Sequence, residues 1–108
     1  DLPWGSYEVL GEFPSYKVKT ICVKPGGRLS YQRHAKRAEH WFIVQGKALV
    51  TINGETKELS AGATVDFAVG VLHRIENVGT EEVIFVEVQT GTYFGEDDIE
   101  RVEDDFGR

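Results

Sequence analysis

Four side chains with nitrogen or oxygen donors occur at spacings that could bring them to one place: Gln32, His34, Glu39 and His73. Gln32 and His34 are two residues apart, so on a β-strand their side chains point the same way. Glu39 opens one apolar run, and His73 opens a later strand-like run. Such donors on adjacent strands suit a divalent cation, with Zn as the first expectation and Mn, Co, Ni or Fe as alternatives. The competing interpretation is a polar cluster inside a barrel without a metal.

Short β-rich runs between evenly spaced turn signals predict the elements that would position these donors. Asn53-Gly54, between two of the runs, is the strongest short signal for a hairpin. We expect strands over Tyr16–Lys24, Ala48–Ile52, Glu55–Leu59, Thr64–Phe67, His73–Asn77 and Glu82–Gln89. One short helix is expected around Glu96–Val102, because its leading acidic residues suit a helix N-terminus. This pattern predicts an all-β sandwich or closed barrel.

Length and charge limit the class of protein. The 108 residues predict one domain over residues 1–108. Twelve Lys and Arg against 18 Asp and Glu give a net charge of −6, which argues against nucleic acids and anionic membranes as partners. The single cysteine, Cys22, excludes an internal disulfide and favours a reducing compartment, so we expect a cytoplasmic protein. No apolar run approaches the ~20 residues of a membrane span.

Glycines spaced around the four donors form two motifs that resemble the signature of the cupin superfamily. The first half runs Gly26, Gln32, His34, Glu39, Gly46, and the second runs Gly62, Ala68, Gly70, His73, Asn77. In the family pattern a histidine stands in place of Gln32 and a proline in place of Ala68. The resemblance implies an antiparallel jelly-roll β-barrel, in which the glycines allow turns with positive φ and Asn77 closes a turn.

A narrower resemblance, to the type II mannose-6-phosphate isomerase domain, covers almost the whole chain. Its segments are Pro3–Tyr7, Lys17–Lys19, Gln32–His34, Arg37–Trp41, Glu87–Gln89, Gly95–Asp104 and Gly107-Arg108. It implies a homodimeric, metal-dependent enzyme of GDP-mannose and polysaccharide biosynthesis that interconverts mannose 6-phosphate and fructose 6-phosphate through a cis-enediol. In that family a sugar nucleotidyltransferase domain usually precedes this one, so the chain is expected to be a free-standing member or an excised C-terminal piece.

Two residues are candidates for catalysis. Glu87 shares a strand face with Phe85 and Gln89, and burial on that face would raise its pKa toward the range of a general base. A rim ion pair with a lysine is the alternative for Glu87. Arg101 lies within an acidic tail that the resemblance links to isomerase activity, and we expect it to bind the substrate phosphate together with Lys19.

The remaining basic residues are expected to form a solvated surface for the most part: Lys17, Arg33, Arg37 and Arg74. Alternation along the strand through Glu39 places His40 and Phe42 on the opposite face, so His40 is expected to be exposed or at an interface rather than a fifth ligand. Apolar outward positions such as Phe42 and Val44 support the homodimer. Two other functions stay open: a different metal-dependent cupin enzyme such as a dioxygenase, and a non-catalytic sugar-binding module.

Overall fold

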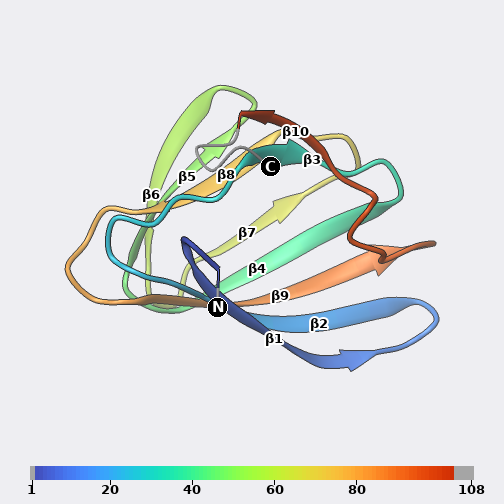
Figure 1. Ribbon diagram of the computed structural model, residues 1–108, viewed down its shortest axis with the longest axis horizontal. Coiled ribbons are helices and arrows are strands. Elements are labelled where there is room, and N and C mark those ends of the chain that lie inside the picture. The colour runs from blue at the N-terminus through green and yellow to red at the C-terminus, as the bar shows by residue number, and fades with distance from the viewer. Residues whose placement is uncertain (1, 104–108) are drawn as a thin grey trace.

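Two five-stranded antiparallel sheets form the part of the chain that this computed structural model describes, residues 2–103 (Figure 1). One sheet has the strand order β1-β2-β9-β4-β7 and the other β10-β3-β8-β5-β6, and the two lie as opposed layers. The strands are β1 Gly5–Glu12, β2 Tyr16–Val23, β3 Tyr31–Arg33, β4 Arg37–Gln45, β5 Lys47–Ile52, β6 Glu55–Ser60, β7 Thr64–Phe67, β8 His73–Asn77, β9 Val83–Gly91 and β10 Glu100–Glu103. The prediction of an all-β jelly roll is confirmed.

Alternation along the central strands places one face of each strand between the sheets. On β2, β4 and β9 nearly every second residue is buried. The apolar members of this interior form one cluster with residues of the opposite sheet: Trp4, Ile21, Val23, Trp41, Ile43, Ala48, Val50, Leu59, Phe67, Ile75, Val83 and Phe85. Removal of these side chains from water is the main favourable contribution to folding.

The turn signals in the sequence correspond to turns in the structure. Asn53 and Gly54 have φ values of 46° and 86° and join β5 to β6, so the hairpin prediction is confirmed. Each of the four motif glycines has a positive φ, as expected. At Gly46 a side chain would also meet the Glu82 carbonyl oxygen, 2.7 Å from an added Cβ, so this position needs glycine for space as well.

The short helix expected around Glu96–Val102 is wrong, because no helix occurs among residues 2–103. Residues Glu100–Glu103 instead form β10, which pairs with the edge of β3. Arg33 donates from Nε and Nη2 to the Glu100 carboxylate at 3.0 and 2.9 Å. A single short helix is marginal in water, whereas the free edge of β3 offers backbone partners, so the strand is favoured. In the same part of the chain, no helix is long and apolar enough to cross a membrane.

The outward face of β4 carries the exposed residues that alternation predicts. The side chain of His40 is 45% exposed, and it lies against Asp66 and Thr90 on the neighbouring strands. Phe42 and Val44 are also exposed on this face. The homodimer stays a prediction, supported by this apolar outer surface.

Asn77, the last residue of the second motif, links the two sheets. It is buried, and its Nδ2 donates to the carbonyl oxygens of Val23 and Glu81, both at 2.8 Å. Its Oδ1 accepts from the Gly79 N–H at 2.9 Å, which closes the turn expected there. Every hydrogen-bonding atom of this amide head group therefore has a partner.

Asn77→Asp should destabilise the fold by roughly 2–4 kcal/mol, because a buried carboxylate cannot donate to two carbonyl oxygens. Urea unfolding at pH 7 measures this change. Val78→Ala, at the exposed neighbouring position, should stay within about 0.5 kcal/mol of the wild type. Equal unfolding midpoints for the two variants would contradict the role given to the Asn77 amide.

Candidate metal centre and cavity

The inward face of the first sheet is divided into an apolar half and a polar half. At the polar end of β2, β4 and β9 the buried residues are Lys17, Lys19, Arg37, Glu39, Glu87 and Gln89. Cross-strand pairing aligns them, since Lys19 is opposite Glu87 and Lys17 is opposite Gln89. Gln89 in turn is opposite Glu39. The register of three antiparallel strands therefore gathers the charged groups at one end of the barrel.

Contacts between the two motif segments bring His34 and His73 together. The Gly70 N–H donates to the His34 carbonyl oxygen at 2.8 Å. Gln32 on β3 pairs with His73 on β8. The Phe67 ring stacks on the His73 imidazole, with ring centroids 4.4 Å apart. Residues almost 40 positions apart in the sequence thus share one site.

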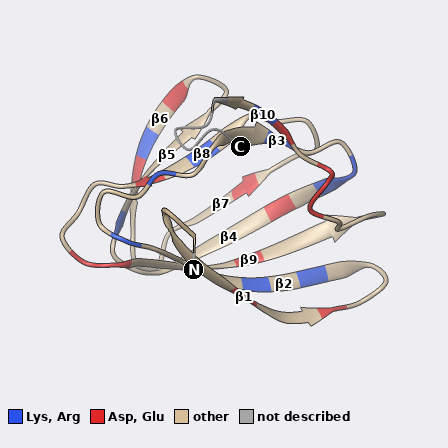
Figure 2. Ribbon diagram, viewed as in Figure 1, with Lys and Arg blue, Asp and Glu red and all other residues tan. Residues whose placement is uncertain are grey.

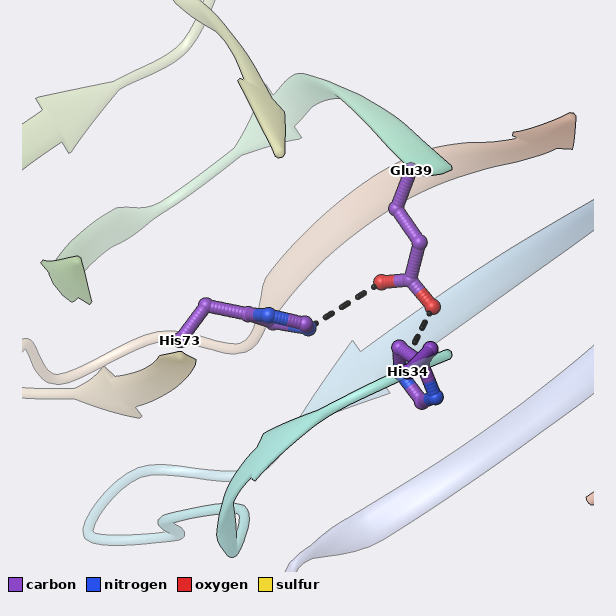
Figure 3. A group of neighbouring side chains, drawn as sticks. All are labelled: His34, Glu39 and His73. Atoms are coloured by element: carbon purple, nitrogen blue, oxygen red, sulfur yellow. Dashed lines mark ion pairs between the residues drawn. The ribbon is translucent and has the colours of Figure 1, made fainter. Parts of the chain in front are cut away.

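Glu39 lies between two imidazoles (Figure 3). Its Oε2 is 3.1 Å from Nε2 of His34, and its Oε1 is 3.3 Å from Nε2 of His73. All three residues are buried, and their ligand atoms lie within 4.8 Å of one another. Atoms bound at about 2.1 Å in a tetrahedral zinc site lie roughly 3.4 Å apart, so the three side chains are already close to that arrangement.

The other nitrogen of each imidazole faces a backbone carbonyl group. Nδ1 of His34 is 2.7 Å from the Asp98 carbonyl oxygen, and Nδ1 of His73 is 3.0 Å from that of Val71. A carbonyl oxygen can only accept, so each Nδ1 carries a hydrogen and donates it. A neutral imidazole then has its lone pair on Nε2, toward Glu39. Hydrogen bonds of this kind orient histidine ligands in metal sites.

A lone pair on Nε2 that faces a carboxylate oxygen needs a hydrogen or a cation beside it. Arg37 Nη2, 3.4 Å from Nε2 of His34, supplies one such contact. Otherwise each imidazole carries a second proton, or one divalent cation is shared by all three side chains. Arg37 already lies against Glu39, with Nε and Nη2 each 3.1 Å from Oε2. Two imidazolium groups would add to that charge in a buried place, which is costly. The donor set therefore fits a divalent metal ion, and it leaves the identity of the metal open.

The charges of Glu39 and His73 support each other. Burial alone would raise the pKa of Glu39, but its contacts with His34 and His73 outweigh burial and hold this pKa well below its usual range. Burial also opposes the charge on His73, yet the bond to Glu39 and the carboxylate charge raise the pKa of this imidazole. The carboxylate is thus kept ionised, as a metal ligand must be.

Gln32 lines the same cavity as Glu39 and His73. Its amide Nε2 donates to Ser30 Oγ at 3.1 Å and to the Ser30 carbonyl oxygen at 3.4 Å. Ser30 is buried and had no signal in the sequence. The structure therefore gives Gln32 a defined orientation, while its part as a fourth ligand stays a prediction.

Glu87 lies inside the barrel, and the alternative of a rim ion pair is wrong. Its Oε1 accepts from Trp41 Nε1 at 3.0 Å, and its Oε2 accepts from Gln89 Nε2 at 2.6 Å. Burial and the nearby charge of Glu39 raise the pKa of Glu87 to about 7, although the Gln89 bond and the charges of Lys19 and Arg37 act against the shift. A carboxyl group with such a pKa can gain or lose a proton near neutral pH.

The expectation of a solvated basic surface is wrong for most of the residues concerned. Four described basic residues are buried: Lys17, Lys19, Arg37 and Arg74. Only two buried carboxylates, Glu39 and Glu87, accompany them among residues 2–103. Figure 2 shows basic segments along β2 and acidic ones on the β9–β10 connection. A chain with a net charge of −6 therefore has an excess of positive charge in its interior.

A cavity of about 260 Å³ opens at the polar end of the barrel. Its lining includes three of the predicted metal ligands, Gln32, Glu39 and His73. It also includes the predicted base Glu87 and the predicted phosphate ligands Lys19 and Arg101. Arg101 is exposed, and it reaches this lining because it pairs with Gln32, the partner of His73. His34 lies behind the lining, in contact with Glu39.

Asp98 is a residue that the sequence analysis missed. Besides the bond of its carbonyl oxygen to His34, its carboxylate accepts from the Ala35 and Lys36 N–H groups at 3.0 and 2.9 Å. The segment between β9 and β10 is thus attached to a candidate metal ligand. No spacing rule could have indicated this contact, because it joins residues more than 60 positions apart.

Comparison with known proteins shows which proteins this sequence resembles. The family model described as mannose-6-phosphate isomerase C-terminal matches residues 2–104. A mannose-1-phosphate guanylyltransferase of Salmonella montevideo is 48% identical over 106 residues, which is 98% of this chain and 22% of that protein. The chain thus spans about a fifth of the length of this relative.

Solved structures show the same fold at low sequence identity. A protein of Klebsiella pneumoniae with a double-stranded beta-helix domain superposes with a TM-score of 0.84 at 24% identity, over 95% of this chain and 83% of that one. The cupin domain of Schizosaccharomyces pombe Cnp3 gives a TM-score of 0.75 at 22% identity, over 79% of this chain and 63% of that one. These likenesses concern the fold alone.

His34→Ala and His73→Ala should each abolish stoichiometric metal binding, because each removes one of three clustered donors. Elemental analysis after reconstitution with zinc measures the metal content, and circular dichroism checks that the β fold is kept. His40→Ala is the matched control, since this histidine lies on the outer face and should leave the metal content unchanged. Full metal content in both cavity variants would place the site elsewhere.

Proposed function

This chain belongs to the mannose-6-phosphate isomerase C-terminal family, and we propose that it interconverts mannose 6-phosphate and fructose 6-phosphate. The observation that carries the proposal is the combination found at one cavity. Three groups lie together there: the potential metal ligands His34, Glu39 and His73, a carboxyl group with a pKa of about 7, and an excess of buried cations. A metal-dependent aldose–ketose isomerase that acts on a phosphosugar can use each of these three components.

The buried cations suit a substrate with a negatively charged group. Lys19 lines the cavity at the end of β2, and Arg101 reaches it from β10 on the opposite sheet. A phosphate group at the mouth would accept hydrogen bonds from both side chains, and the planar guanidinium could donate two of them. The sugar carbon atoms would then extend inward, toward Glu39 and Glu87.

Glu87 is the residue proposed to move the proton. Its carboxylate would take the proton from C2 of the open-chain aldose, which gives the cis-enediol in its ionised form. Transfer of the hydroxyl proton from O2 to O1, and return of the first proton to C1, would then give the ketose. Trp41 and Gln89 hold the two oxygens of this carboxylate from opposite directions, so its orientation is defined. A divalent cation bound by His34, Glu39 and His73 would supply Lewis acidity toward the sugar oxygens.

The segment between β9 and β10 would keep water from the enediol. It runs from one sheet to the other and contributes Glu96, Ile99 and Arg101 to the cavity lining. A cavity from which water is excluded strengthens the electrostatic contacts inside and limits side reactions of the intermediate.

The direct test is an isomerase assay on the purified, metal-reconstituted chain, with mannose 6-phosphate as substrate and fructose 6-phosphate as the measured product. Turnover that depends on added metal would support the proposal. Tight binding of the phosphosugar without turnover would instead indicate a binding module, and oxygen uptake with iron would indicate a dioxygenase.

Glu87→Gln should reduce kcat by at least about 100-fold, because an amide cannot accept the proton. In the wild type, kcat/KM should fall as the pH drops below about 7, since the carboxylate with its raised pKa becomes protonated and can no longer act as a base. Glu58→Gln, on the exposed surface of β6, is the control and should keep the wild-type profile. An unchanged acidic limb in Glu87→Gln would assign the base to another residue.

Arg101→Ala should cost roughly 2–4 kcal/mol of transition-state stabilisation, since it removes a charge-assisted contact at the cavity. Arg101→Lys should recover only part of this loss, because an ammonium group cannot make a bidentate contact. Rates are compared at equal metal content, with Lys57→Ala on exposed β6 as a control. If Arg101→Ala retains the full rate, the phosphate must be held by other cations.

A further inference from the structure

Glu96 lies against the cations at the polar end of β2. Its Oε2 is 2.7 Å from Nζ of Lys19 and 3.8 Å from Nζ of Lys17. The side chains of the two lysines are 6% and 9% exposed, whereas that of Glu96 is 55% exposed. Lys17 also lies 3.7 Å from the Glu12 carboxylate, which is exposed at the barrel rim. An exposed carboxylate thus reaches inward to a pair of buried ammonium groups.

Arg37 adds a third positive charge to this group. Hydrogen bonding to Lys19 and the charges of Lys19, Arg37 and Lys17 lower the pKa of Glu96 against the effect of its partial burial. Arg37 uses Nε and Nη2 to bind Glu39, but its buried Nη1 has no hydrogen-bond partner among residues 2–103. A buried donor without a partner is costly, so a ligand atom at this end of the cavity would satisfy it.

Exposed carboxylates compensate the two lysines incompletely, while Arg37 pairs with the buried Glu39. Lys17 and Lys19 occupy alternate positions on one strand face, so two like charges are buried side by side. An ion pair with a solvent-exposed partner contributes little, because water screens it. A phosphate group carries close to two negative charges and several acceptor oxygens, which suits three neighbouring cations better than a single carboxylate does.

The segment that carries Glu96 is attached to the metal cluster at its other end. This segment, residues 95–99, is called the strap here. A turn formed by the Asp98 N–H and the Gly95 carbonyl oxygen shapes it, and Asp98 binds His34 and the following backbone. The strap is therefore held at two places. Asp98 binds His34 and its neighbouring backbone, and the Glu96 side chain, two residues earlier, binds Lys19.

We propose that Lys17 and Arg37 complete, with Lys19, the phosphate-binding site to which Arg101 contributes from β10, and that the Glu96 carboxylate fills this site until a ligand displaces it. The identity of the ligand as a phosphosugar rests on the proposed function, whereas its class as a phosphate rests on the three cations. Glu96 competes with phosphate for the same cations, so the measured phosphate affinity is lower than that of the site with Glu96 removed. Release of Glu96 leaves Asp98 in place, and the cavity opens at the mouth while the His34 contact is kept.

The test is calorimetric titration of the full chain with inorganic phosphate at constant ionic strength. Glu96→Gln should bind phosphate about fivefold or more tightly than the wild type, the gain expected when competition with a partly exposed ion pair is removed. Asp97→Asn is the matched control, because it removes the same charge from the strap at a residue that binds Tyr93 rather than Lys19. Lys19→Met should weaken phosphate binding in both the wild-type and the Glu96→Gln background.

Three results would overturn the inference: equal affinity of Glu96→Gln and wild type, an equal gain in Asp97→Asn, or a phosphate signal that disappears on chelation and so belongs to the metal. The assay also separates this inference from the proposed function. A gain in Glu96→Gln without any isomerase turnover would keep the phosphate site and reject the isomerase. Isomerase turnover with no effect of Glu96→Gln on phosphate affinity would keep the isomerase and reject the competition by Glu96.

Discussion

Charged side chains on the inward face of β2, β4 and β9 must find partners within the barrel, because an unpaired buried charge costs several kcal/mol. The strand register brings these groups together by placing Lys19 opposite Glu87, and Gln89 between Lys17 and Glu39. The same strands supply the apolar core at their other ends. The core thus holds the sheets together, and the rigid sheets hold the charges in a fixed arrangement that solvent cannot rearrange.

Within that arrangement the Glu39 carboxylate has the central position. Two imidazoles and one guanidinium converge on its oxygens, and backbone carbonyl groups fix the far side of both imidazoles. Such a group is preorganised for a dication, since its lone pairs point inward before any metal arrives. The interior then carries more positive than negative charge although the chain as a whole is acidic. This contrast between global and local charge would allow an acidic protein to attract the anionic ligand proposed for it.

The β9–β10 connection contacts both the His34–Glu39–His73 cluster and the buried lysines. Its backbone binds His34 through the Asp98 carbonyl oxygen, and its Glu96 side chain binds Lys19. Pairing of β10 with β3 then carries Arg101 to the row formed by Gln32 and His73. In a helix, successive side chains point in different directions around the axis. A helix over the same residues would therefore not have placed Arg101 beside Gln32 and His73 in the sheet. The strand is therefore what allows the tail to contribute to the site.

The sequence by itself determined the local features: the strand pattern, the Asn53-Gly54 turn, the positive-φ glycines and the residue types of the donor set. The strands, the turn and the glycine conformations depend on near neighbours, through the two-residue period of a strand and the steric limits on φ, and the structure bears them out. Only the tertiary structure decided which charges are buried. Lys17, Arg37 and Arg74 read as surface residues because their burial depends on partners from distant strands. The contacts of Asp98 and Glu96, and the choice of strand over helix for Glu100–Glu103, likewise depend on an edge and on cations supplied by other parts of the chain. No local pattern encodes them, since their free energy comes from contacts that exist only after the sheets have packed.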